Sequence, residues 1–376
     1  MDPKFEAATK IARYAFRVVN SDVFNDQWTP NSWSITAIVL LSMVPVCTIF
    51  WKNPAKISTV ILTENIGLTF VSLQTIHCLL EIIVKRNSWK NIMKEVEQRR
   101  YQYKTPKSSP VFDEFYQRTV LFSKFIYAMY FSTSCYYLFP IVAADPEKFY
   151  LPFGFTLPLL DVKTSLGYCL NYVYQVLIVT ICQHSLCGHF STVTVAVLSA
   201  CCQIRCIKIL LRDLNELLNS PIEQPEAIRE LLAEIINLHA TNIEFIQRLQ
   251  NLLSWVYLTI FITCGMVTFS TLNMVVDNPW TSATFLFIGG TGSVLLHCFY
   301  GNMLLVENDT LADAFYAIDW YWLAVRERKA FRFTLANAQP DMQLHGIFAP
   351  VNQATSVAII RAAFSYFSIL MNFSSE

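Results

Sequence analysis

Charged side chains are scarce in this sequence. Asp, Glu, Lys and Arg make up 15% of its 376 residues, whereas about 25% is typical of a soluble domain. Hydrophobic residues make up 54%, and the mean hydropathy is +0.38. This composition excludes an ordinary soluble domain and predicts an integral membrane protein.

Motifs of catalytic and cofactor sites are also missing. The sequence contains no Gly-rich phosphate loop, dinucleotide fingerprint, nucleophile elbow or HExxH zinc motif. Cys182, His184, Cys187 and His189 resemble a metal cluster. On one helix, however, two of them face one way and two the other, so a four-ligand zinc site would require a broken helix. We therefore predict no enzyme, no catalytic residue, no metal and no cofactor. Ionisable groups are not paired across several apolar segments, which disfavours a proton-coupled transporter.

Long apolar runs are abundant, and about 20 helical residues cross a hydrocarbon layer of about 30 Å. The fourth run is ambiguous, because Ser165–Leu211 carries only Arg205 and Lys208 as charges and could form one long helix or two spans. The candidate spans are Trp33–Phe50, Ile66–Val84, Thr119–Ala143, Ser165 onward, Asn251–Val276, Thr281–Val306 and Ala354–Phe373.

The distribution of Lys and Arg favours one long fourth helix and hence seven spans. With seven, 22 basic residues lie on one side of the membrane and four on the other, whereas eight spans would divide them evenly. Because basic loops stay in the cytoplasm, we expect a cytoplasmic amino terminus and an extracellular carboxyl terminus. This is the inverse of a G-protein-coupled receptor.

The predicted fold is therefore an all-α membrane protein with a cytoplasmic helical anchor bundle. Helical patterns at Ile204–Leu218 and Ala227–Leu252 extend spans four and five into the cytoplasm, and Asp309–Phe331 reads as an amphipathic cytoplasmic helix. The expected segments are a cytoplasmic amino-terminal segment 1–32 lying on the inner membrane surface, spans one to six with their extensions in 33–306, a cytoplasmic helix and flexible linker in 307–351, and the last span with the carboxyl terminus in 352–376.

Lys85–Arg118 carries nine basic residues. Such a run could bind nucleic acid, but a cytoplasmic loop beside lipid headgroups is the better interpretation in a membrane protein. We expect membrane lipids and no nucleic acid among the partners.

The last span is unusually polar, since Arg361, Ser365 and Asn372 interrupt it. Ser365, Ile369 and Asn372 share one helical stripe. Buried polar positions in a span face protein or water rather than lipid. The stripe therefore indicates either a water-filled pore or an ordinary interface between helices.

The segment His297–Trp320 resembles the signature of the insect odorant receptors. The matching residues are Cys298, Tyr300, Gly301, Asn302, Glu307, Leu311, Ala314, Tyr316 and Trp320. The basic patch Arg326–Arg332, the linker Gln339–Pro350 and the terminal Phe364–Phe367 extend this resemblance over about the last 80 residues. The chain lacks the long insertion between spans four and five of the family's co-receptor, so it resembles a ligand-tuning subunit.

The resemblance implies a ligand-gated, nonselective cation channel of the plasma membrane. Tuning and odorant co-receptor subunits would form a heterotetramer around one pore lined by the last span. Ile369 and Asn372 match the family's constriction residues, although those are Val and Gln in the family pattern. This places Ser365, Ile369 and Asn372 at the pore.

The resemblance also implies a site for a small volatile in the outer halves of spans two to six. Its aromatic character would suit an aromatic or heterocyclic odorant, although some of these side chains could instead face lipid. The candidate ligand-binding residues are Phe70, Leu73, Gln74, Tyr130, Ser134, Tyr137, Tyr168, Asn171, Tyr172, Met266 and Phe269.

Three other functions remain open at this point. A gustatory-type homotetrameric channel would conduct without a co-receptor. A G-protein-coupled receptor would have its amino terminus outside, and a transporter would carry substrate without unitary channel openings.

Overall fold

The structure is a computed structural model of the chain. It describes residues 3–25, single positions between 33 and 43, residues 59–102, 106–143, 151, 156, 157, 160–222, 224–277, 282–339 and 342–374. At 59–65, 133–143, 273–277, 282, 283, 285 and 370–374 it describes the backbone alone. The expected first span, Trp33–Phe50, therefore falls largely outside the described residues.

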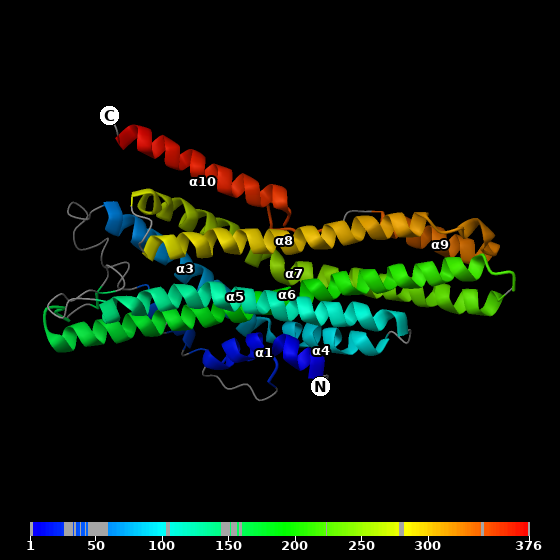
Figure 1. Cartoon of the computed structure of the whole chain (residues 1–376), viewed down its shortest axis with the longest axis horizontal. Helices are drawn as coiled ribbons and strands as arrows, with labels where there is room; N and C mark the ends of the chain where they lie inside the picture. Colours follow the sequence, from blue (N-terminus) through cyan, green and yellow to red (C-terminus); the bar gives the residue numbers. More distant parts are fainter. Residues whose placement is uncertain are drawn as a thin grey trace.

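Nearly all of the described chain is helical, as the composition predicts, and the long helices run along one axis (Figure 1). Within the described residues, the β structure is limited to an isolated bridge between His345 and Pro350. The helices are α1 (Pro3–Val18), α3 (Thr59–Val84), α4 (Arg86–Gln102), η2 (Pro106–Ser108), α5 (Ser109–Ala143), α6 (Ser165–Leu218), α7 (Pro225–Asp277), α8 (Ser282–Tyr316), η3 (Trp320–Trp322), α9 (Val325–Ala338) and α10 (Gln353–Ser374).

The fourth apolar run forms one helix, as the distribution of basic residues predicts. α6 has 54 residues, which at 1.5 Å per residue gives about 80 Å, far more than a bilayer requires. α7 has 53 residues and begins at Pro225, a residue suited to the first helical turn. The two helices form the expected hairpin, which projects well beyond the thickness of a membrane.

Three helical segments within the described residues are long and apolar enough to cross a membrane. They are Ile66–Val84, Ser165–Leu218 and Pro225–Leu272. They correspond to the expected spans two, four and five. α3 ends at Val84 as predicted, but it begins at Thr59, before the expected Ile66.

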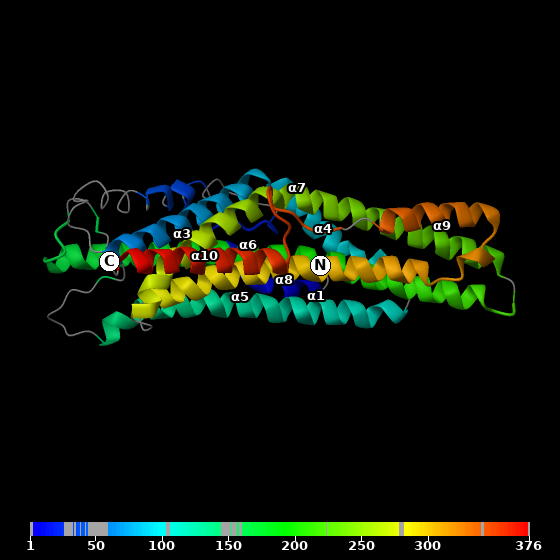
Figure 2. The ribbon, with the colours of Figure 1, turned by 90° about the horizontal axis from the view of Figure 1, so that it is seen from above.

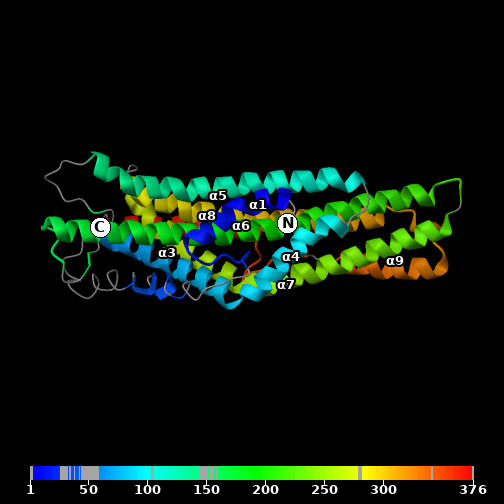
Figure 3. The ribbon, with the colours of Figure 1, turned by 90° about the horizontal axis from the view of Figure 1, so that it is seen from below.

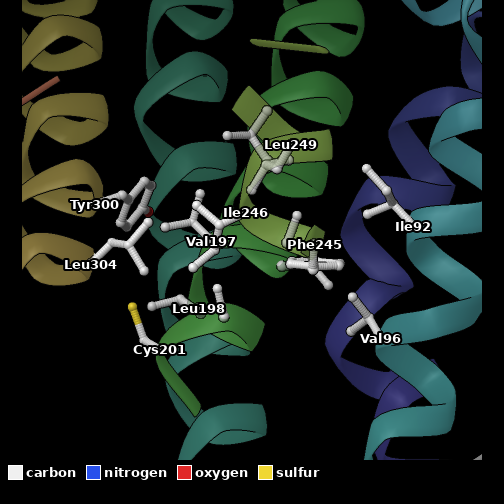
Figure 4. Close-up of a cluster of buried hydrophobic side chains, with 14 of the residues drawn as sticks. Ile92, Val96, Val197, Leu198, Cys201, Phe245, Ile246, Leu249, Tyr300 and Leu304 are labelled. Carbon is white, nitrogen blue, oxygen red and sulfur yellow. The ribbon is translucent and has the colours of Figure 1, made fainter. Parts of the chain in front are cut away.

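The hydrophobic core includes a cluster where α4 and α8 pack against the α6–α7 hairpin. Figure 4 shows side chains from four helices meeting there, so α4 and α8 join the hairpin in one packed unit. The labelled residues are Ile92 and Val96 of α4, Val197, Leu198 and Cys201 of α6, Phe245, Ile246 and Leu249 of α7, and Tyr300 and Leu304 of α8.

The expectation that the amino-terminal segment lies on the membrane surface is wrong for α1. Its apolar face, including Phe5, Ala12 and Phe16, is fully buried, and the helix packs against α5 and α6 (Figure 3). A Cβ at Gly188 of α6 would lie 2.8 Å from the Phe16 ring. The amphipathic pattern was read correctly, but the missing side chain at Gly188 makes room for a protein partner rather than lipid.

The single helix expected at Asp309–Phe331 is also wrong. α8 continues without a break from the expected sixth span to Tyr316, and the chain then turns through η3 before α9 begins at Val325. Asp319 stabilises this interruption between α8 and α9. Its backbone NH donates to Asn215 Oδ1 (2.9 Å), and its carboxylate accepts from Asn219 Nδ2 (2.8 Å). These bonds to the end of α6 replace helical bonds.

The linker before α10 is more ordered than its Pro and Gly content suggests. Gly346 and Val351 donate backbone hydrogen bonds to Ala349 (2.8 Å) and Leu344 (2.7 Å). The side-chain amide of Gln250 on α7 bonds to both backbone groups of His345, at 2.7 and 2.8 Å. From Met342 onward the expected flexible segment is thus a turn held against α7.

Candidate ligand site and pore helix

Gln74 is a buried polar residue of α3 at the contact with α7. Its side chain is 3% exposed. The amide oxygen accepts a hydrogen bond from the Cys264 thiol (3.4 Å) and lies 3.3 Å from the hydroxyl oxygen of Thr263. Within the part of the chain that the structure describes, the amide nitrogen Nε2 is buried without a hydrogen-bond partner. An unpaired buried donor is costly, so a ligand that accepts from this nitrogen would recover the lost hydrogen bond.

Tyr130 of α5 approaches the same point from the other side. Its hydroxyl lies 2.9 Å from Ser293 Oγ on α8. Because Ser293 donates its own proton to the carbonyl of Gly289 (2.6 Å), Tyr130 is the donor in this pair. The Tyr130 ring packs against Phe190 of α6, with ring centroids 5.9 Å apart.

Cys264 connects these two groups. Its thiol donates to Gln74 Oε1 and lies near Ser293. Cys264 and Ser293 are each only 1% exposed. Two of the eleven expected ligand-site residues, Gln74 and Tyr130, are thus brought into one dry polar cluster contributed by α3, α5, α7 and α8.

Other expected ligand-site residues lie elsewhere. Asn171 is 1% exposed, but its amide accepts from Leu157 N (2.6 Å) and donates to Gly167 O (2.8 Å). It therefore fixes the chain before α6 and has both ends of its amide occupied. Leu73 is 43% exposed and points away from the cluster at Gln74. Tyr168 and Tyr172 are half-buried and pack against each other, with ring centroids 6.1 Å apart.

The remaining expected residues divide into two groups. Phe70, Met266 and Phe269 are half-buried on α3 and α7. The side chains of Ser134 and Tyr137 lie outside the described residues. Sequence reasoning missed Cys264 and Ser293, because it favoured aromatic residues and considered few small polar ones. Gly290 allows α8 to approach α7 closely. Small polar residues near such a glycine in an apolar span were the sequence signal that could have identified Cys264 and Ser293.

α10 runs along the outside of the bundle beside α7 and α8 (Figures 1 and 2). Asn352 caps its first turn, since Oδ1 accepts from Thr355 N at 3.0 Å. Tyr366 meets Phe269 of α7, with ring centroids 6.4 Å apart. The stripe residue Ile369 is 50% exposed in the single chain.

Ser365 is exposed as well, and its hydroxyl donates to the carbonyl of Arg361 (2.9 Å). This bond satisfies the hydroxyl within the helix. The side chain of Asn372, the third stripe residue, lies outside the described residues. The described part of the stripe, Ser365 and Ile369, is thus exposed in the single chain.

The profile of the family described as "7tm Odorant receptor" matches residues 60–364, which is most of the chain. The chain belongs to the insect odorant receptor family. Membership makes it a seven-transmembrane odorant receptor.

Individual odorant receptors are distant in sequence. Odorant receptor 22a of Drosophila melanogaster is 25% identical over 185 residues, which are 48% of this chain and 46% of that receptor. Odorant receptor 22c of the same species is 24% identical over 155 residues, which are 40% and 39% of the two chains. The matched part thus spans less than half the length of these relatives.

The fold is shared along nearly the whole chain with a solved insect olfactory receptor, OR5 from Machilis hrabei. Its complex with eugenol matches with a TM-score of 0.79 and 13% identity, covering 97% of both chains. A second structure of OR5 matches with a TM-score of 0.76 and 14% identity over 96% of both. The likeness shows the odorant receptor fold.

Proposed function

We propose that this chain is the ligand-tuning subunit of an odorant-gated, nonselective cation channel in the plasma membrane. A small volatile binds among the outer halves of the spans, and a pore lined by α10 opens in a heterotetramer with an odorant co-receptor. The amino terminus is cytoplasmic and the carboxyl terminus extracellular, with spans one to six in 33–306, an anchor in 307–351 and the pore segment in 352–376.

The observation that carries the ligand proposal is the unpaired Nε2 of Gln74. In an apolar cavity, a site built to make a hydrogen bond discriminates strongly against molecules that lack the matching group. The preferred odorant therefore has an acceptor oxygen, such as a carbonyl, ether or phenol oxygen. The related fold of OR5 is known in complex with eugenol, which supports a small aromatic ligand for this chain too.

The coupling to the pore runs through α7. This helix carries Cys264 at the ligand cluster and, somewhat further along, Phe269, which contacts Tyr366 of α10. A ligand that binds the open arrangement more tightly shifts a pre-existing closed–open equilibrium. Displacement of α7 at Cys264 would then be transmitted to α10 by direct side-chain contact.

Co-expression with an odorant co-receptor, with current recorded over a panel of volatiles, tests this proposal. Gln74→Leu should raise the half-activating concentration of acceptor-bearing ligands about ten-fold, because one hydrogen bond in a dry site is lost. Gln203→Leu is the matched control: Gln203 is 2% exposed and also has an unpaired amide atom, but it lies outside the cluster.

Three results would contradict the proposal. Equal sensitivity of Gln74→Leu and the parent channel to every active volatile would remove Gln74 from the ligand site. Ligand-evoked current from this chain alone would replace the heterotetramer with a homotetrameric, gustatory-type channel. An amino-terminal epitope accessible on intact cells would reverse the proposed orientation.

A further inference from the structure

A cleft of ≈ 410 Å³ lies on α6 and is bordered by α5 and α8. Its lining residues are Val111, Arg205, Lys208, Ile209, Arg212, Glu307 and Ala314. A smaller hollow of ≈ 20 Å³ adjoins it through the shared residues Val111 and Arg205. The walls of this hollow are mainly apolar, with Phe115, Leu198 and Met303 among them.

The cleft has more positive than negative groups. Arg205 bonds to Glu307 (2.6 Å) and Glu114 (3.2 Å), and Lys208 bonds to the same Glu307 (2.6 Å). Arg118, at the mouth of the smaller hollow, shares Glu114 at 2.5 Å. Three cations thus depend on two carboxylates.

Arg212 adds a fourth cation. Its side chain is exposed, and it forms no ion pair with a carboxylate in the part of the chain that the structure describes. The local charge balance therefore leaves capacity for an anion. Guanidinium groups are suited to phosphate, because they donate parallel hydrogen bonds.

The position of the cleft along the bundle points to a lipid. Arg118 directly precedes the expected third span, and Glu307 directly follows the expected sixth span. The cleft thus lies where α5 and α8 leave the membrane. Its apolar hollow is on the membrane side, next to Met303, and its cationic groups are on the water side. A phospholipid requires this arrangement, because its acyl chain lies on the membrane side and its phosphate on the water side.

We propose that this cleft binds one anionic phospholipid. Its phosphate lies among Arg118, Arg205, Lys208 and Arg212, and the start of an acyl chain lies along Phe115 and Met303 between α5 and α8. The bound lipid adds a further contact between α5 and α8, which also meet directly at Tyr130 and Ser293. With the proposed orientation of the chain, the lipid belongs to the cytoplasmic leaflet.

The test uses the purified full chain in detergent, without an odorant. Its Tm is measured against increasing dioctanoyl-phosphatidylserine, dioctanoyl-phosphatidylcholine or inorganic phosphate. The serine lipid should raise the Tm at concentrations at which the other two have no effect. The variant R118Q/R212Q should raise the half-effect concentration of the serine lipid about thirty-fold, since each basic group contributes to binding an anionic headgroup.

R326Q/R332Q is the matched control, because it removes the same charge from exposed positions of α9 outside the cleft. It should leave the half-effect concentration unchanged. If R118Q/R212Q unfolds, R212Q alone provides the comparison and should give about a five-fold change.

Three outcomes would overturn the proposal. Equal stabilisation by the choline lipid would show that the net charge is irrelevant. Equal stabilisation by phosphate would show a free anion site, and an unchanged half-effect concentration in R118Q/R212Q would move the lipid elsewhere. None of these measurements involves an odorant or current, so their outcome is independent of the proposed channel function.

Discussion

The carbonyl oxygen of Val351 occupies the space that a Cβ on Gly301 would require. Gly301 is in α8, within the signature segment of the odorant receptors, and Val351 directly precedes the turn into α10. Both residues are buried. The close approach places the start of α10, the proposed pore helix, on α8. The requirement for glycine here is one of space rather than backbone conformation.

Gly301→Ala should therefore destabilise the seat of α10. The added methyl group must displace backbone, which typically costs about 1–3 kcal/mol. We expect a lower Tm of the purified chain and less current on co-expression. Gly289→Ala in the same helix is the control, because its Cβ would meet nothing within 4 Å. A parent-like Tm and current in Gly301→Ala would show that the linker shifts at no cost.

Replacement of Ile369 by Ser should raise the ligand-free current. If the closed pore buries this half-exposed side chain between subunits, its loss removes about 1 kcal/mol. That change shifts the closed–open equilibrium about five-fold. Val357→Ser is the control, since Val357 is equally exposed but lies on another face of α10. Unaltered basal current and ion selectivity in Ile369→Ser would count against the pore stripe.

Arg99 of α4 should be a main determinant of stability in the projecting half of the bundle. It is 2% exposed, and its guanidinium carbon lies 3.6 Å from the centroid of the Phe245 ring. The same group donates to Ser199 Oγ (3.3 Å) and pairs with Glu95 (3.3 Å). It thereby joins α4 to α6 and α7.

Arg99→Met should cost about 2 kcal/mol, because the desolvated cation–π contact and the hydrogen bonds are lost together. Lys at this position should not restore the stability, since it lacks a planar group to stack. Arg100→Met, at a partly exposed neighbour, is the control and should have little effect. Thermal unfolding of the purified variants measures both. Equal Tm values for Arg99→Met and Arg100→Met would refute this role.

Asp319 should make the junction between α6 and η3 sensitive to acid. Hydrogen bonds from Asn219 and Tyr321 lower the pKa of its carboxyl from 3.8. A lowered folded-state pKa means that the stabilisation is present above pH 3.8 and is lost as the pH falls through the folded-state value. The Tm difference between the parent and Asp319→Asn should therefore persist at neutral pH and vanish in acid. A difference that is constant across this range would contradict the assignment.

The long-range organisation could be predicted in part from the sequence. Pro221 and Pro225 mark the turn of the α6–α7 hairpin, and the scarcity of charge before Arg205 indicates one continuous fourth helix. These features are local or compositional, so they can be recognised without knowing how the helices pack. The apolar face of α1 could also be predicted, but its partner could not. The same amphipathic pattern suits a helix that packs on lipid and one that packs on protein.

The break at Asp319 illustrates a different limit. The sequence around it continues a helical pattern, and the turn is selected by Asn215 and Asn219, about a hundred residues away in the chain. The ligand cluster has the same character. Gln74 and Tyr130 were predicted. The thiol of Cys264 and the hydroxyl of Ser293 become part of the cluster only because α7 and α8 approach each other closely.

The sequence by itself determined that the chain is helical and membrane-bound, and that it carries the signature of odorant receptors. Apolar content, helical period and charge distribution are properties of each segment on its own. Only the tertiary structure decided which amide is left unpaired among the described residues, where α10 packs and which cations share two carboxylates. These depend on distances between segments far apart in the chain, and a separation of a few ångströms determines whether two groups bond, collide or remain free.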